Sequence, residues 1–235
     1  MNTRKNELAD AVAQVKEDLA EAAKKAGRTP DDVSLVAVSK LHPASDIRDL
    51  VESGHMDFGE NYVQEVQKKQ ETLADLDVNW HFIGGLQSNK AKFVAGKFAL
   101  IHSVDSLKLA QALHKKAVSL DVVQDILLQV NIAEETQKSG IAVDSLQELA
   151  DEVMKMDNIR LVGLMTMPPF FNEPELARPV FSRLRELRDG LETHVGRPLP
   201  HLSMGMTGDF IPAVEEGATL VRIGTRIFGA RPPRG

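Results

Sequence analysis

The feature that most constrains the fold is an alternation of short apolar runs with amphipathic segments along the chain. The apolar runs are nearly continuous, as expected for strands of a parallel sheet that is buried on both faces. Between them, apolar residues recur at spacings of three and four, which is typical of helices that cover a sheet. The expected strands are residues 34–39, 57–59, 80–83, 99–104, 125–131, 159–165, 201–203 and 219–223.

A helical segment follows almost every expected strand, and another precedes the first. The simplest arrangement is a single (β/α)8 TIM barrel with an extra N-terminal helix, and its usual length of about 250 residues suits a 235-residue chain. An open doubly wound sheet is the alternative, but its glycine-rich first turn is missing from Lys40–Pro43. No linker divides the chain, so we expect one domain over residues 1–235. The expected helices contain residues 8–19, 43–54, 62–73, 88–95, 107–113 (capped by Asp105), 146–153, 180–191 (with Pro179 in the first turn) and 209–217 (capped by Thr207 or Asp209).

Composition excludes several classes of protein. With 28 Lys and Arg against 34 Asp and Glu, the net charge of −6 argues against a nucleic-acid binder that depends on a basic surface. The chain has no cysteine, so it forms neither disulfides nor thiolate metal sites. Its apolar runs fall short of the roughly 20 residues that span a bilayer, and residues 1–16 have no signal-peptide core. We therefore expect a cytoplasmic protein without a membrane partner.

Reactive residues of barrels gather at the carboxyl ends of the strands. The first expected strand ends at Lys40, where desolvation can favour the neutral amine that forms a Schiff base with an aldehyde. A solvated lysine at a strand exit is the ordinary alternative. Glycine- and hydroxyl-rich loops around Ser203, Gly224 and Thr225 follow the last two strands, where barrels commonly bind phosphate. Ordinary turn chemistry explains these loops equally well. Lysine and phosphate loops together suggest a ligand with an aldehyde and a phosphate.

Other polar residues have simpler interpretations. We expect His81 and His102 to be hydrogen-bonded core histidines, and the Lys68–Lys69 and Lys115–Lys116 pairs to lie on solvated helix faces. The histidine spacing matches no metal motif, so we predict no metal site. Methionines at 165, 167, 204 and 206 are typical of a pocket wall or barrel core.

Several stretches carry a family resemblance over nearly the whole chain. The chain resembles the pyridoxal phosphate homeostasis proteins, also called proline synthetase co-transcribed homologues, whose fold is that of the N-terminal barrel of alanine racemase. One departure is Thr207, where the family usually has serine. The matching stretches are residues 36–40 (VAVSK), 58–65 (FGENYVQE), 81–90 (HFIGGLQSNK), 129–131 (QVN), 138–140 (KSG), 163–168 (GLMTMP), 202–206 (LSMGM), 221–225 (VRIGT) and 228–229 (FG).

The resemblance implies pyridoxal 5′-phosphate (PLP) as the cofactor. Lys40 is similar to the lysine that holds PLP as an aldimine, and Arg222 to the arginine that faces the pyridine nitrogen. Asn61 resembles the asparagine beside the cofactor. Ser203, Gly224 and Thr225 resemble the phosphate ligands, and we add the neighbouring Met204 to the cofactor-binding set as part of the pocket wall.

The resemblance favours a cofactor carrier over an enzyme. Racemases of this type take a second base, a tyrosine, from a β-rich second domain of the partner chain, whereas only eleven residues follow Gly224 here and Tyr62 is the single tyrosine. We therefore expect a non-catalytic monomer that serves intracellular PLP homeostasis and passes cofactor to PLP-dependent apoenzymes. A weak amino-acid racemase is the first alternative, and a Schiff-base aldolase the second.

Overall fold

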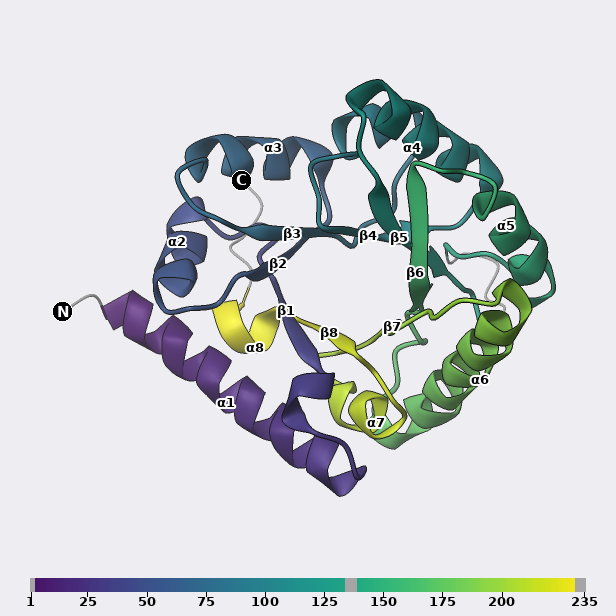
Figure 1. Cartoon of the computed structure of the whole chain (residues 1–235). Coiled ribbons are helices and arrows are strands. Elements are labelled where there is room, and N and C mark those ends of the chain that lie inside the picture. The colour runs from purple at the N-terminus through teal and green to yellow at the C-terminus, as the bar shows by residue number, and fades with distance from the viewer. Residues whose placement is uncertain (1–2, 134–138, 231–235) are drawn as a thin grey trace.

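Eight parallel strands close into a barrel in sequence order, and β1 pairs with β8 to complete it (Figure 1). The computed structural model describes residues 3–133 and 139–230. This architecture confirms the predicted barrel. Its strands are β1 (Ser34–Val38), β2 (Asp57–Glu60), β3 (Asn79–Phe82), β4 (Leu100–Val104), β5 (Gln124–Gln129), β6 (Ile159–Met165), β7 (His201–Met206) and β8 (Leu220–Ile223).

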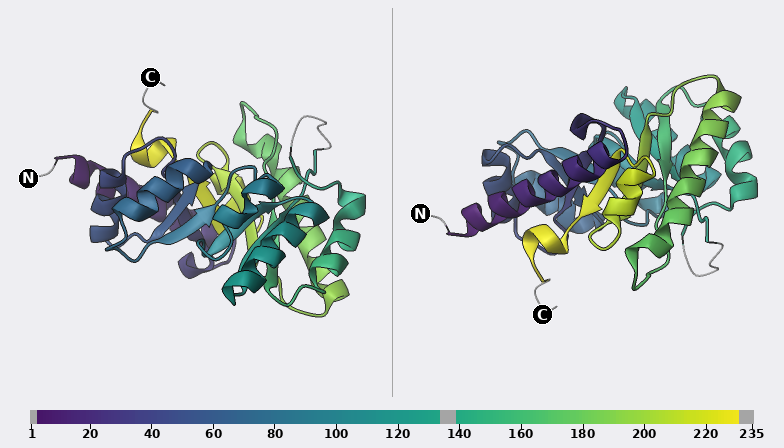
Figure 2. Two further views of the ribbon diagram at one scale, coloured as in Figure 1. Left: turned by 90° about the horizontal axis from the view of Figure 1, so that it is seen from above. Right: turned by 90° about the horizontal axis from the view of Figure 1, so that it is seen from below.

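Helices surround the barrel on its outer side (Figure 1). The predicted N-terminal helix, α1, packs against α2, α7 and α8, and the right-hand view of Figure 2 shows it alongside the yellow C-terminal segment. Within the described part of the chain, no helix is both long and apolar enough to cross a bilayer. The α-helices are α1 (Thr3–Lys25), α2 (Ala44–Glu52), α3 (Val63–Thr72), α4 (Leu107–Leu120), α5 (Leu146–Val153), α6 (Arg178–Val195), α7 (Phe210–Glu215) and α8 (Thr225–Phe228).

The strands bury both faces, as their apolar runs predict. Val36 belongs to a small cluster that is separate from the main core, whereas its neighbours Leu35 and Ala37 belong to the main core. Because side chains alternate along a strand, the small cluster fills the barrel interior and the main core lies between the barrel and the helices. The interior cluster consists of Val36, Leu100, Leu127, Val162, Met165 and Leu220.

Four local predictions are corrected. The sequence predicts a helix over residues 88–95, whereas the structure has a 3₁₀ helix there, η2 (Ser88–Phe93). Ser106, not Asp105, caps α4, because its hydroxyl accepts a hydrogen bond from the Leu109 amide. Strand β7 continues to Met206, past its predicted end at Ser203. Lys69 is buried, whereas the sequence placed it on a solvated helix face.

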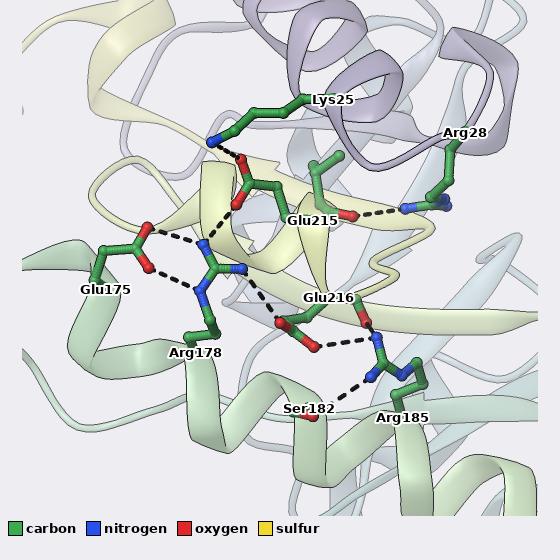
Figure 3. A network of polar contacts seen from close by, with 9 residues as sticks. Lys25, Arg28, Glu175, Arg178, Ser182, Arg185, Glu215 and Glu216 are labelled. Carbon is green, nitrogen blue, oxygen red and sulfur yellow. Dashed lines mark hydrogen bonds and ion pairs between the residues drawn. The ribbon is translucent and has the colours of Figure 1, made fainter.

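An ion-pair network joins α6 to α7 and α1 (Figure 3). The Arg178 guanidinium donates to both carboxylate oxygens of Glu175, at 2.7 and 2.9 Å, and to Glu215 at 2.5 Å and Glu216 at 3.2 Å. Glu215 also pairs with Lys25 of α1 at 2.6 Å. The network is partly shielded from solvent, since the Glu215 and Glu216 side chains are only 10% and 15% exposed.

We expect Arg178→Ala to lower the free energy of unfolding by about 1–3 kcal/mol, because it leaves shielded carboxylates without their shared partner. Urea denaturation measures this loss. The matched control is Arg183→Ala on the same helix, since Arg183 makes an exposed pair with Glu186 at 3.0 Å that is worth about 0.5 kcal/mol or less. Equal losses in the two variants would contradict a stabilising network.

Candidate functional site

A cavity of about 250 Å³ opens at the carboxyl ends of the strands, where barrels place their reactive residues. Residues that end or follow β1, β2, β3, β6, β7 and β8 contribute to its wall. The wall combines apolar surface with one lysine, one arginine and several hydroxyl and backbone groups. Its lining residues are Val38, Lys40, His42, Asn61, Ile83, Met167, Met206, Thr207, Gly208, Arg222, Gly224 and Thr225.

Five of the seven predicted site residues line this cavity. The structure places Lys40 and Asn61 on one side of the barrel closure and Arg222, Gly224 and Thr225 on the other. Gly224 passes so close to β1 that a Cβ atom would lie 3.2 Å from the Val38 carbonyl oxygen. A glycine at this position therefore allows the β8 exit to approach the β1 exit.

Ser203 and Met204 do not line the cavity, in contrast to their predicted place. Met204 is fully buried in the core between the barrel and the helices, and Ser203 points into the barrel interior against Arg222 and His102. The reason is the length of β7: because the strand continues to Met206, the residues at its carboxyl end are Met206, Thr207 and Gly208. Thr207, which lines the cavity, brings a hydroxyl-bearing side chain to the end of this strand.

Arg222 is a buried cation that faces the cavity with unusual hydrogen-bond partners. Its guanidinium donates to the Ser203 hydroxyl oxygen at 2.5 Å and to the Thr166 carbonyl oxygen at 3.0 Å. Both acceptors are uncharged, so neither neutralises the guanidinium. Burial lowers the pKa of Arg222 to about 10, which leaves the group charged at neutral pH. Such a cation favours an anionic or electron-rich ligand in the cavity.

A chain of hydrogen bonds runs from Arg222 through the barrel. Ser203 Oγ lies 2.7 Å from His102 Nδ1, His102 Nε2 lies 3.0 Å from His81 Nδ1, and His81 Nε2 lies 3.2 Å from Asp57 Oδ1. Because a guanidinium only donates, the network is fully satisfied when the Ser203 hydroxyl donates to His102, His102 to His81, and His81 to the carboxylate. This confirms His81 and His102 as hydrogen-bonded core histidines.

The electrostatics of the chain agree with that direction. Burial, followed by the charges of His81 and Arg222, lowers the pKa of His102 well below its ordinary value, so its imidazole is neutral. Burial acts to raise the pKa of Asp57, but the hydrogen bond and charge of His81 bring it below the ordinary value. A neutral imidazole and an ionised carboxylate are the states that the donor assignment requires.

Lys40 follows β1 in a tight turn. The His42 amide donates to the Ser39 carbonyl oxygen at 3.0 Å, and Leu41 has a φ of +66° at the third position of the turn. A type II turn normally has glycine there, so a leucine stores backbone strain that its surroundings must hold. The Leu41 amide donates to Glu65 Oε1 at 2.6 Å. The turn thus fixes the backbone on both sides of Lys40.

Asn61 and His42 add polar groups to the wall. The Asn61 Oδ1 atom is buried without a hydrogen-bond partner among the described residues, so it can accept a bond from a ligand. The His42 ring stacks on Phe228 at 4.9 Å, and burial lowers the pKa of His42, which keeps the imidazole neutral. The pattern of strand ends does not indicate His42, although its place two residues after Lys40 could have suggested it.

No group of three or more histidine, aspartate or glutamate side chains in the two described ranges is arranged to hold a metal ion. Lys138, which belongs to one of the matching stretches, lies outside the described residues.

Comparison with known proteins places the chain in a family. The alanine racemase N-terminal domain matches residues 11–232, so the chain belongs to that family of barrels. Alanine racemase from Clostridium difficile shares the fold at a TM-score of 0.74 and 14% identity, with coverage of 97% of this chain and 58% of the racemase. Within the family, the chain belongs to the pyridoxal phosphate homeostasis proteins.

Relatives with that name are similar over nearly their full length. The protein from Aquifex aeolicus is 46% identical over 220 residues, which covers 94% of this chain and 96% of the relative. The protein from Pseudomonas aeruginosa is 47% identical over 224 residues, which covers 95% and 96%. PipY from Synechococcus elongatus, whose structure was solved with PLP bound, has a TM-score of 0.84 and 35% identity, with coverage of 94% of this chain and 100% of PipY.

Proposed function

We propose that this chain binds PLP covalently and reversibly through Lys40, and that it holds the cofactor for intracellular homeostasis rather than for turnover. The observation that carries the proposal is the pairing of Lys40 with the buried, charged Arg222 in one cavity. The bound form of PipY and the names of the close relatives support it.

The residues present fit PLP. Lys40 would supply the amine for the aldehyde, and Arg222 would donate toward the ring nitrogen. The hydroxyls of Thr207 and Thr225, with the backbone at Gly224, would hold the phosphate. The buried, unpartnered Asn61 Oδ1 supplies an acceptor beside the ring. When bound, PLP supplies an aldehyde that exchanges between amines and a ring that withdraws electrons.

Arg222 limits how strongly that ring withdraws electrons. A guanidinium that keeps its proton and donates a hydrogen bond to the ring nitrogen opposes protonation of that nitrogen. Because the protonated ring is the strongest electron sink, the arrangement favours binding over carbanion chemistry. The racemases of this fold are expected to share the arginine, so this residue does not separate a carrier from an enzyme.

A racemase also needs a second base on the opposite face of the substrate. Among the described residues that line the cavity, the ionisable side chains are Lys40, His42 and Arg222. Tyr62 lines a neighbouring groove instead and is 46% exposed. His42 is stacked on Phe228, which ties its ring to the wall. We therefore propose a non-catalytic role, as a monomer in the cytoplasm that passes PLP to apoenzymes.

Lys40→Ala should abolish covalent capture of PLP, because no other lysine is proposed to reach the aldehyde. The measurement is mass spectrometry of the peptides after borohydride reduction, with Lys90→Ala as the control variant that retains the adduct. Circular dichroism should show the same folded spectrum for both. A reduced adduct that maps to Lys90 would contradict the assignment.

Ser203→Ala should weaken binding of PLP and of pyridoxal, which lacks the phosphate, by the same factor. The reason is that Ser203 is bonded to Arg222, and a lost bond to a charged group costs about 1.5–3 kcal/mol, or roughly tenfold or more in affinity. Thr207→Val should weaken the binding of PLP but not that of pyridoxal. Spectroscopic titration measures the four dissociation constants. If Ser203→Ala weakens the binding of PLP and leaves the binding of pyridoxal unchanged, Ser203 contacts the phosphate.

Incubation of the PLP-loaded protein with L-alanine should give little racemisation. Absence of a positioned second base typically costs about 10²–10⁴ in rate. Chiral chromatography measures the D-alanine formed. A turnover near 1 s⁻¹, within roughly the ordinary enzyme range, would overturn the carrier proposal and favour the racemase. In that case His42→Leu would test whether the neutral imidazole acts as the second base.

A further inference from the structure

A buried ammonium group contacts the turn that carries Lys40. Lys69 Nζ, on α3, donates to the Ser39 carbonyl oxygen at 2.8 Å, to Glu60 Oε1 at 2.6 Å and to Glu65 Oε1 at 2.7 Å. The Ser39 hydroxyl donates to Glu60 Oε1 at 2.8 Å. We call Ser39, Glu60, Glu65 and Lys69 the Lys69 cluster. It lies behind the cavity wall and includes none of the cavity-lining residues.

Burying the charges of the Lys69 cluster costs free energy of hydration. The Lys69 side chain is 7% exposed and that of Glu60 is fully buried, and each charge loses several kcal/mol of hydration. The three N–H groups of the ammonium match the three acceptors. Burial raises the pKa of Glu60, although the charge of Lys69 opposes the shift. Apolar side chains of similar volume would stabilise the fold as well.

The Lys69 cluster forms hydrogen bonds with the backbone on both sides of Lys40. Lys69 binds the carbonyl oxygen of Ser39, the preceding residue, and orients Glu65. Glu65 in turn accepts the amide of Leu41, the following residue, whose positive φ is strained. One ammonium therefore links the two peptide groups that determine where the Lys40 side chain leaves the chain.

We propose that Lys69, acting with Glu65, is a positioning residue for Lys40: it holds the strained turn so that the Lys40 amine points into the cavity. This inference rests on the proposed function. Without these hydrogen bonds, the turn relaxes and the Lys40 amine adopts a wider range of orientations. Covalent capture of an aldehyde therefore becomes slower and weaker. Recognition of the ring and phosphate by Arg222, Thr207 and Thr225 stays unchanged.

The experiment compares two ligands that differ at the reacting carbon. PLP carries the aldehyde, whereas 4′-deoxypyridoxine 5′-phosphate keeps the ring and phosphate but cannot react with an amine. In Lys69→Met and Glu65→Leu, we expect the rate and equilibrium constants for capture of PLP to fall by about 10- to 100-fold. The dissociation constant of the deoxy analogue should stay within about twofold. Lys68→Met, at the exposed neighbouring position, is the matched control and should match the unmodified chain for both ligands.

A second set of variants separates positioning from folding. Glu65→Gln keeps an oxygen for the Leu41 amide and should restore most of the capture rate, while thermal unfolding reports whether each variant folds. Glu65→Leu leaves the Lys69–Glu60 pair intact, so it decides the outcome if Lys69→Met is unfolded. Equal weakening of the binding of both ligands would show that Lys69 has a general structural role. Unchanged capture of PLP would show that Lys69 does not position Lys40. Either result overturns the inference. If the unmodified chain itself captures no PLP, the proposed function is wrong and the inference falls with it.

Discussion

The pairing of β1 with β8 is the constraint on which the site depends. Val36 lies opposite Arg222 and Ala37 opposite Ile223, so the exits of the first and last strands are adjacent in space. Lys40 follows one exit and Gly224 and Thr225 follow the other, although they lie at opposite ends of the sequence. In an open sheet these two strands would be free to lie at separate edges. Closure of the barrel thus brings a nucleophilic amine, a buried guanidinium and the proposed phosphate-binding loop into one cavity.

Two polar arrays support this cavity from opposite faces of the strands. Strand β2 contributes to both, because Asp57 and Glu60 are three residues apart and therefore point to opposite sides of the sheet. Asp57 ends the hydrogen-bond chain inside the barrel that leads to Arg222, while Glu60 belongs to the Lys69 cluster outside the barrel, next to the Lys40 turn. The interior array fixes the guanidinium and the exterior array fixes the turn. Both arrays contain buried charges, and burying a charge costs free energy that an apolar core does not. We therefore attribute the buried charges to the needs of the site and not to the stability of the fold.

The sequence predicts the barrel and much of the cavity because both depend on where apolar runs end. Strand ends indicate Lys40, Gly224 and Thr225, each of which follows a strand. The resemblance to the family adds Asn61 and Arg222, and both line the same cavity. Ser203 and Met204 were misplaced because a run that contains Gly205 does not indicate that β7 continues to Met206. The sequence mispredicts the burial of Lys69, because Lys68 and Lys69 look like an ordinary pair of lysines on a charged helix. Nothing in that pair indicates that carboxylates from β2 and α3 enclose Lys69 while Lys68 stays exposed. Contacts between elements, unlike strand ends, leave no periodic pattern in the sequence.

The charge distribution explains how an acidic protein can hold an anionic cofactor. The chain has a net charge of −6, which repels polyanions such as nucleic acids over the surface as a whole. Within the described wall of the cavity, by contrast, the permanently charged group is Arg222, and its hydrogen bonds go to an uncharged hydroxyl and a carbonyl. The nearest carboxylate along its hydrogen-bond chain is Asp57, beyond Ser203 and two histidines. The Asp209 carboxylate acts on Arg222 through its charge, but neither hydrogen-bond acceptor of the guanidinium is charged, so positive potential remains beside the cavity. A small phosphorylated aldehyde that fits the cavity meets that potential, while a large polyanion meets the acidic surface first.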